Sequence, residues 1–398
     1  MKEQRKVPQI RFKGFTDDWE QRKVTEIGKL YIGLVTTMTS HYTNKGTLLI
    51  RNSDIKDNHF EFGEEPIYLD EEFANKNSNR KHEIGDVITV HTGDVGTSAV
   101  IDKNTDKSIG FATIITRPNS NIIDSYYLSI FLNTEKHKKW AILISTGDGR
   151  TNYNLGDYQK LIVPLTTVDE QRKIANFISN IDNLITLHQR KCDKLIEVKK
   201  SLLEKMFPKN SSKIPEIRFK GFTDDWEQRK VSDIFKVTRG YVLASTMTNE
   251  KKSAGMVYPV YSSQTKDNGL MGYYKDYLYE DAITWTTDGA NAGTVNYRTG
   301  QFYCTNVCGV LLSKKIKANP MIAEALNKIA KQYVSYVGNP KLMNNVMADI
   351  ELQIPKQEEE REQLSQTFVS LDNLITLHQR KLEKLKEVKK SMLEKMFV

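Results

Sequence analysis

The sequence lacks the long apolar run that a membrane-spanning helix requires. No stretch approaches the roughly 18 consecutive apolar residues that cross a bilayer. The N-terminal MKEQRKVPQ also has no apolar segment of the kind found in secretory signals. Cysteine is scarce, because Cys192, Cys304 and Cys308 are too few for a disulfide framework or a zinc site. We therefore expect a cytoplasmic protein that makes no membrane contact.

Motifs for catalysis are missing as well. The chain has no G-x-x-x-x-G-K-[ST] phosphate loop, and no glycine-rich turn follows a strand as a dinucleotide or methionine-derived cofactor would require. Its two Asn-Pro dipeptides, at Asn319 and Asn339, precede Met and Lys instead of the second proline and aromatic residue of an amino-methyltransferase. The sequence therefore predicts no catalytic residue, no metal site and no cofactor in this chain.

Length and charge limit the class of protein without defining it. The 398 residues are enough for two domains, and the formal net charge of +8 is compatible with nucleic-acid binding. Neither long non-repeated region, 25–164 or 232–355, carries a large excess of basic residues. Any binding site for a polyanion must therefore be a local stripe rather than a uniformly basic surface.

Two segments of the sequence occur twice. Residues 8–24, PQIRFKGFTDDWEQRKV, return at 215–231 with Glu216 in place of Gln9 as the single difference. Residues 182–207, DNLITLHQRKCDKLIEVKKSLLEKMF, return at 372–397 with four differences. The order is therefore motif, variable region and helix, followed by the same order again. This arrangement indicates a duplicated scaffold that carries two unlike domains.

The second repeated segment has the period of a coiled coil. Apolar residues recur at alternating spacings of four and three over more than four heptads, which is typical of two paired helices and not of a lone surface helix. Two such helices in one chain pack most simply as an antiparallel pair. The predicted seam residues are Ile174, Ile178, Ile181, Ile185, His188, Leu195, Leu202, Leu364, Phe368, Leu371, Ile375, His378, Leu382 and Leu385.

The variable regions share a plan although their sequences differ. In each, β-rich runs flank a Gly/Asp turn, as in 86–100 and 281–295, and apolar helical segments follow. Residues 146–164 align with 337–355 at an offset of 191. We expect an α+β fold, with two mixed α/β globular domains separated by the antiparallel coiled coil in an internal pseudo-twofold repeat. The predicted boundaries are 1–165 for domain 1, 166–207 for the central helix, 208–214 for a linker, 215–355 for domain 2 and 356–398 for the C-terminal helix.

This organisation closely resembles the specificity (S) subunit, HsdS, of type I restriction-modification systems, over essentially the whole chain. The resemblance rests on the duplicated FKGFTDDWEQRKV, the asparagine and (L/I)xxP end of each variable region, DGANAGTVNYRTGQFYCTNVCGVL, and the helix with DNLITLHQRK. It implies that each variable region is a target recognition domain for one half of an asymmetric, bipartite double-stranded DNA site. The helices would set the spacer and dock two modification subunits. S-adenosylmethionine, ATP and magnesium would belong to the modification and restriction subunits.

Side chains that reach base edges determine sequence recognition, and loops between strands are the expected carriers. The DNA-binding candidates are His91, Thr92, Asp94, Arg150, Asn152, Asn154, Thr286, Thr287, Asn291, Arg298, Lys341, Asn344 and Asn345. The offset of 191 pairs Asn154 with Asn345, which also suits a shared structural turn, and Arg150 with Lys341, which suits phosphate contact. Three alternatives remain open: a modification-only system, a two-headed coiled-coil adaptor that does not bind DNA, and an enzyme that dimerises through the coiled coil.

Overall fold

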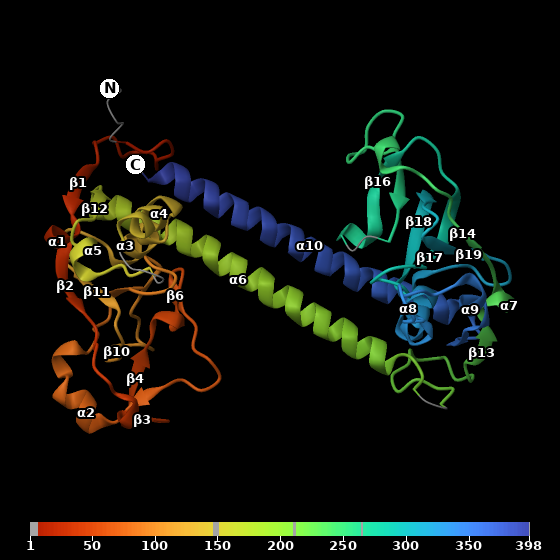
Figure 1. Cartoon of the computed structure of the whole chain (residues 1–398), viewed down its shortest axis with the longest axis horizontal. Helices are drawn as coiled ribbons and strands as arrows, with labels where there is room; N and C mark the ends of the chain where they lie inside the picture. Colours follow the sequence, from red (N-terminus) through yellow and green to blue (C-terminus); the bar gives the residue numbers. More distant parts are fainter. Residues whose placement is uncertain (1–6, 146–150, 210–211, 264–265, 398) are drawn as a thin grey trace. The chain divides into compact units, whose positions relative to one another are not determined.

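The computed structural model describes residues 7–145, 151–209, 212–263 and 266–397. The chain divides into two compact units, which we call unit 1 (residues 1–188 and 381–398) and unit 2 (residues 189–380). Two long helices, α6 (Val168–Lys205) and α10 (Glu358–Met396), each contribute residues to both units (Figure 1). Each unit therefore contains one globular domain and a segment of each long helix.

Unit 1 is built around a four-stranded antiparallel sheet in the order β2-β11-β8-β9. A second sheet has the order β10-β4-β7-β3, and β1 pairs with β12. The strands are β1 (Glu20–Lys23), β2 (Gly28–Ile32), β3 (Tyr42–Thr43), β4 (Thr47–Ile50), β5 (Ile55–Lys56), β6 (His59–Phe60), β7 (Tyr68–Leu69), β8 (Val87–Thr89), β9 (Ser98–Val100), β10 (Ile109–Gly110), β11 (Ile114–Pro118) and β12 (Ile162–Leu165). The short helices are α1 (Val24–Ile27), α2 (Glu71–Lys76), α3 (Ser125–Leu132), α4 (Glu135–Ile144) and α5 (Leu155–Tyr158).

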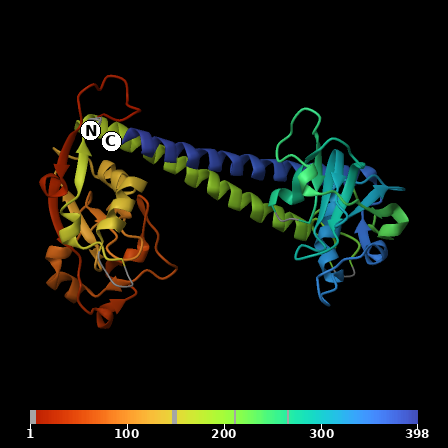
Figure 2. The same cartoon turned by 45° about the horizontal axis from the view of Figure 1, so that its top comes forward.

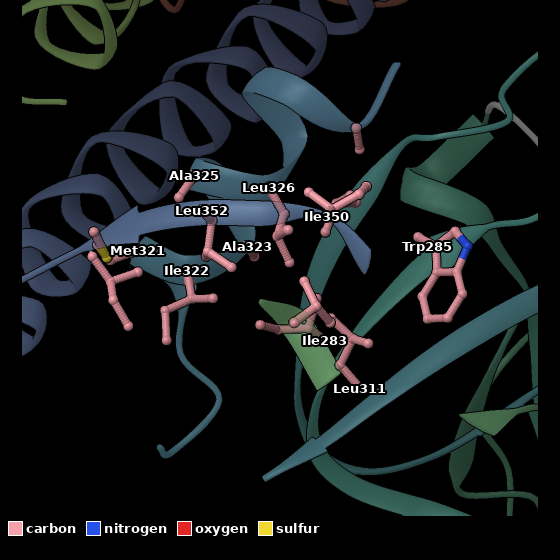
Figure 3. Packing of buried hydrophobic residues seen from close by; sticks show 14 of the residues in the cluster. Ile283, Trp285, Leu311, Met321, Ile322, Ala323, Ala325, Leu326, Ile350 and Leu352 are labelled. Carbon is pink, nitrogen blue, oxygen red and sulfur yellow. The ribbon is translucent and has the colours of Figure 1, made fainter. Parts of the chain in front are cut away.

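Unit 2 contains a six-stranded sheet in the order β14-β19-β17-β18-β15-β16, and β13 pairs with β20. Its strands are β13 (Glu227–Lys230), β14 (Phe235–Arg239), β15 (Tyr258–Tyr261), β16 (Leu270–Tyr274), β17 (Tyr279–Thr286), β18 (Val295–Cys304), β19 (Cys308–Ser313) and β20 (Glu351–Ile354). The helices are α7 (Val231–Ile234), α8 (Pro320–Ile329) and α9 (Asn344–Asp349). Figure 3 shows how Met321 and Leu326 of α8 and Leu352 of β20 lie in the same core as Ile283 of β17.

The first four strands of the unit 2 sheet repeat the unit 1 sheet, although few of the side chains match. β14, β19, β17 and β18 are joined in the same antiparallel order as β2, β11, β8 and β9. A capped helix follows in both units: Asp124 caps α3 through the Tyr127 N–H, and Asn319 caps α8 through the Ile322 N–H. The predicted α+β character, the internal repeat and the two long paired helices are confirmed.

The seventeen repeated residues form a socket around the helix ends. In unit 1, Arg11 donates to Glu170 at the start of α6, and buried Trp19 packs edge-on against Phe397, which follows α10. In unit 2, the equivalent Arg218 donates to Glu360 at the start of α10. Trp226 packs edge-on against Phe207, which follows α6. Each copy of the motif thus holds the beginning of one long helix and the end of the other.

Within each unit the two long helices are paired side by side. In unit 1, Asp182 of α6 forms a salt bridge of 2.5 Å with Lys389 of α10. The end of α10 lies beside the beginning of α6 in both views (Figures 1 and 2). In unit 2, Lys199 bonds Asp372 at 2.7 Å, and the Cys192 thiol lies 3.7 Å from the Ile375 carbonyl oxygen. Higher numbers in α6 meet lower numbers in α10, so the segments are antiparallel. Every residue of the predicted seam is buried or half-buried.

The offset of 191 between the ends of the variable regions is wrong by two residues. Glu20 of β1 pairs with Leu165, whereas the equivalent Glu227 of β13 pairs with Ile354. The structural offset is therefore 189, and Pro164 corresponds to Gln353 instead of Pro355. Glu170 and Glu360 form equivalent ion pairs, and their offset (360 − 170) is one more than that of the strands. The segment between β20 and α10 in unit 2 is therefore one residue longer than the segment between β12 and α6 in unit 1.

Candidate nucleic-acid interface

The loop that follows β8 in unit 1 is joined to the chain that precedes α5. The Tyr153 N–H donates to the His91 carbonyl at 2.9 Å, and Thr92 forms a β-bridge with Asn152. Asn52 supports the loop from a third segment, because its side-chain oxygen accepts from the His91 N–H at 2.8 Å. Three of the predicted DNA-binding residues, His91, Thr92 and Asn152, are therefore brought together from positions 60 residues apart.

The side chains of these three residues form a hydrogen-bonded chain. The Thr92 hydroxyl donates to the Asn152 side-chain oxygen at 2.9 Å, so its own oxygen accepts from Nδ1–H of His91 at 2.7 Å. Burial lowers the pKa of His91, which favours the neutral ring, and the hydrogen bond to Thr92 places the proton of that ring on Nδ1. The arrangement leaves Nε2 of His91 as an acceptor and the amide nitrogen of Asn152 as a donor.

The other predicted residues of unit 1 have different positions. The Asp94 side chain is 77% exposed and accepts from the Thr97 hydroxyl at 2.8 Å. Asn154 caps α5 by accepting from the Asp157 N–H, and its amide also donates to the Asp157 carboxylate. Its observed contacts are therefore those of a structural cap. Arg150 lies outside the described residues.

We call this pairing of the loop after β8 (His91 and Thr92) with the chain before α5 (Asn152 and Tyr153) the joint of unit 1. Unit 2 has the same backbone arrangement with other side chains. The loop that follows β17 meets the chain that precedes α9: the Leu342 N–H donates to the Thr287 carbonyl at 2.8 Å, and Asp288 forms a β-bridge with Lys341. The Lys341 ammonium lies 3.7 Å from the Asp288 carboxylate. Asp288 and Lys341 thus occupy the places of Thr92 and Asn152, and the predicted pairing of Lys341 with Arg150 is wrong.

Two further predicted residues hold the unit 2 loop in place. Thr286 is buried, its N–H donates to the Thr294 carbonyl, and its carbonyl accepts from the Gly293 N–H. Asn291 is half-buried and donates through its amide to the Ser263 carbonyl at 3.1 Å.

Arg298 is buried in the sheet and does not face outward. It is 8% exposed, its guanidinium stacks on the Tyr261 ring at 3.7 Å, and it donates to the Thr284 hydroxyl and the Asn268 carbonyl. Burial lowers its pKa. A cation held in this way connects β17, β18 and the turn after β15, so the expectation that Arg298 contacts DNA conflicts with its placement.

The two asparagines near Lys341 lie on α9. Asn344 begins the helix, and its amide donates to the Thr238 carbonyl at 3.4 Å. Asn345 is exposed on the same helix. With the offset of 189, the counterpart of the Asn154 cap is Met343, which makes no side-chain cap, so the predicted match of Asn154 with Asn345 is also wrong.

Charges beside both joints occur in pairs. Lys138 bonds Asp57 at 2.7 Å and lies 3.9 Å from Asp94, while Lys341 lies near Asp288. A separate cavity of about 270 Å³ in unit 2 is lined by Lys317, Arg361, Glu358 and Glu362, so its charges balance too. The lysines at the candidate interface are therefore balanced by nearby carboxylates and do not form an excess of positive charge. No group of three His, Cys, Asp or Glu within the described ranges could hold a metal ion.

Asn52 and Asp288 belong to the joints but were not among the predicted DNA-binding residues. Asn52 lies 39 positions from His91, and no motif connects the two segments. Asp288 directly follows a β-rich run and precedes Gly289, a pattern that is typical of an ordinary turn. Among the described residues, no helix is long and apolar enough to span a membrane.

The family model for the type I restriction modification DNA specificity domain matches residues 16–197 and 223–387. The chain belongs to this family. The proposed type I specificity subunit S.MpnORF289P N-terminus of Mycoplasma pneumoniae is 44% identical over 126 residues, which are 31% of this chain and 66% of that protein. The type I restriction enzyme MpnII specificity subunit of the same organism is 37% identical over 133 residues, which are 33% of this chain and 39% of the relative.

The fold is similar to that of a solved structure. The type I restriction-modification system S subunit from M. genitalium superposes with a TM-score of 0.71 at 15% identity, over 98% of this chain and 99% of that chain. At this identity the likeness concerns the fold. The alignments to the curated relatives above cover less than two thirds of each relative's length.

Proposed function

We propose that this chain is the DNA sequence-recognition subunit of a type I restriction-modification complex, with no catalytic site of its own. The variable domain of each unit would recognise one half of a bipartite, asymmetric duplex site in the cytoplasm. One observation carries the proposal: both units have the same backbone joint, but Thr92 and Asn152 in unit 1 are replaced by Asp288 and Lys341 in unit 2. A shared backbone arrangement with different polar side chains suits two domains that recognise different DNA sequences.

The hydrogen-bonding groups of the unit 1 joint complement an adenine. Adenine presents an N7 acceptor and an N6 amino donor in the major groove. The Asn152 amide can donate to N7, and Nε2 of His91 can accept from the N6 amino group, because Thr92 fixes the orientation of both side chains. We propose these two residues as base readers in unit 1.

Replacing Asn152 with Ala is expected to relax discrimination at one base of the half-site read by unit 1 by about 1–3 kcal/mol. Fluorescence anisotropy with duplexes that vary one base at a time would measure the change. The control is Asn121→Ala, since Asn121 is exposed in a turn of the same unit. An equal loss of affinity for all duplexes would contradict base reading by Asn152.

Lys341 is proposed as a phosphate contact, because its side chain is half exposed at the joint. Lys341→Ala should weaken binding to all sequences about equally and reduce the slope of log affinity against log salt by about one. Lys275→Ala is a matched control: this lysine is also exposed beside an aspartate, but it precedes β17 instead of following it. Loss of discrimination at a single base with an unchanged slope would show Lys341 to be a base reader.

The partner subunits are assigned by the same proposal. The paired helices would dock two modification subunits and set the spacer between half-sites. S-adenosylmethionine would be bound by the modification subunits, and ATP and magnesium by restriction subunits. A modification-only complex would use this chain in the same way and would lack the restriction subunits.

Duplex binding by the complex tests the proposal. The chain should be co-expressed with its modification subunit, and salt-dependent binding to DNA that carries the methylated motif compared with a scrambled duplex. The expected result is a clear preference for the motif. Equal binding to both duplexes, or no binding at low salt, would contradict the proposed function.

A further inference from the structure

A short loop in unit 2 presents two apolar side chains to solvent. Residues 335–341 are closed by reciprocal backbone bonds, with the Ser335 N–H donating to the Lys341 carbonyl at 2.8 Å and the Lys341 N–H to the Ser335 carbonyl at 2.9 Å. Gly338 permits the turn with a φ of 76°. At the tip, Tyr336 is 70% exposed and Val337 is 92% exposed.

The base of this loop is anchored in the joint described above. The Gly289 N–H donates to the Pro340 carbonyl at 2.9 Å, and the Leu342 N–H donates to the Thr287 carbonyl at 2.8 Å. The buried indole of Trp285 donates to the Leu342 carbonyl at 3.0 Å. These bonds tie the loop to the end of β17 and to the core, so its tip is held beside the polar joint of unit 2.

The exposure of two adjacent apolar side chains at the tip of an anchored loop is typical of an interaction site. Water contact with apolar surface carries a free-energy cost, and concentrated exposed apolar residues mark interaction sites. Tyr333 and Met343 on either side of the loop are exposed as well. Asp288 and Lys341 lie at the base of the loop, so the partner that fits offers an apolar face next to polar groups.

We propose that Tyr336 and Val337 form an apolar wedge that inserts against a base step of the DNA half-site read by unit 2. Proteins that kink DNA use exposed apolar side chains of this type to stabilise unstacked base pairs. The inference rests on the proposed function. Modification of a base in a duplex requires removal of that base from the stack, and a wedge would lower the cost of this distortion.

The test uses the full chain in complex with its modification subunit and the double variant Tyr336→Ser/Val337→Ser. Both side chains are exposed, so the variant should fold. The DNA probe is a duplex of the methylated motif with 2-aminopurine in the half-site of unit 2. A second duplex carries a mismatch at the same step, which removes most of the unstacking cost in advance. Tyr277→Ser is the control, because this exposed tyrosine precedes the start of β17.

The double variant should lose about tenfold or more in affinity for the intact duplex, and less than about threefold for the mismatched duplex. The rise in 2-aminopurine fluorescence seen with the unmodified complex should disappear. Unchanged affinity and fluorescence, or equal losses on both duplexes, would overturn the wedge while leaving the proposed function intact. Loss of the modification subunit with DNA binding retained would assign the loop to a protein contact. If the unmodified complex does not prefer the motif, the proposed function itself fails.

Discussion

Replacing residues 232–355 with the same region of another member of the family should change one half of the methylated DNA motif and leave the other half unchanged. The exchanged region contains the β17 loop, Lys341 and the 335–341 loop. Arg218, Trp226, Phe207 and Glu360, which join the repeated motif of unit 2 to the long helices, lie outside it. The new domain can therefore enter the same socket, and sequencing of the methylated genome would identify the new motif.

The reciprocal exchange of residues 25–164 provides the matched control. Its socket, built by Arg11, Trp19, Glu170 and Phe397, also lies outside the exchanged segment. This exchange should alter only the half-site that the first exchange left intact. A change in both halves after either exchange would refute independent readers.

Glu360→Ala should lower the free energy of unfolding of unit 2 by about 3–5 kcal/mol. The Arg218 and Glu360 side chains are 12% and 2% exposed, and their two hydrogen bonds are 2.7 and 2.8 Å long. Truncation leaves the buried guanidinium without its carboxylate, and the Trp226 indole loses its bond of 3.3 Å to the same group. Denaturant unfolding followed by tryptophan fluorescence would measure the change.

Two controls separate burial from charge alone. The Lys76–Glu72 pair has side chains that are 71% and 82% exposed, and Glu72→Ala should leave the unfolding midpoint essentially unchanged because solvent screens this pair. Replacement of both buried partners, Arg218→Met with Glu360→Leu, should recover much of the stability lost by Glu360→Ala. Equal effects of Glu360→Ala and Glu72→Ala would show that the socket adds no stability.

The repeat and the long helices could be predicted because their signals are local and regular. A 3.5-residue spacing kept over many turns has few structural interpretations, and Lys199 and Lys389 occur in that spacing. The structure adds their partners, Asp372 and Asp182, which face them from the other helix. The pairing of those charges depends on the register between helices, which the spacing within each helix does not specify.

The candidate interface was predictable only in part. His91 and Thr92 were located by the Gly/Asp turn, and Asn152 by the polar run before the final strand. The correct offset of 189 requires strand pairing, because few side chains match between the two regions. The burial of Arg298 likewise depends on Tyr261 and Asn268, which are distant in sequence.

Methylome sequencing of a host that carries this chain and its modification subunit tests the two-reader claim most directly. The expected result is one adenine-methylation motif in two unlike parts separated by a fixed run of unspecified bases. A single continuous motif, or the absence of any new methylated motif, would contradict the presence of two independent readers in one chain.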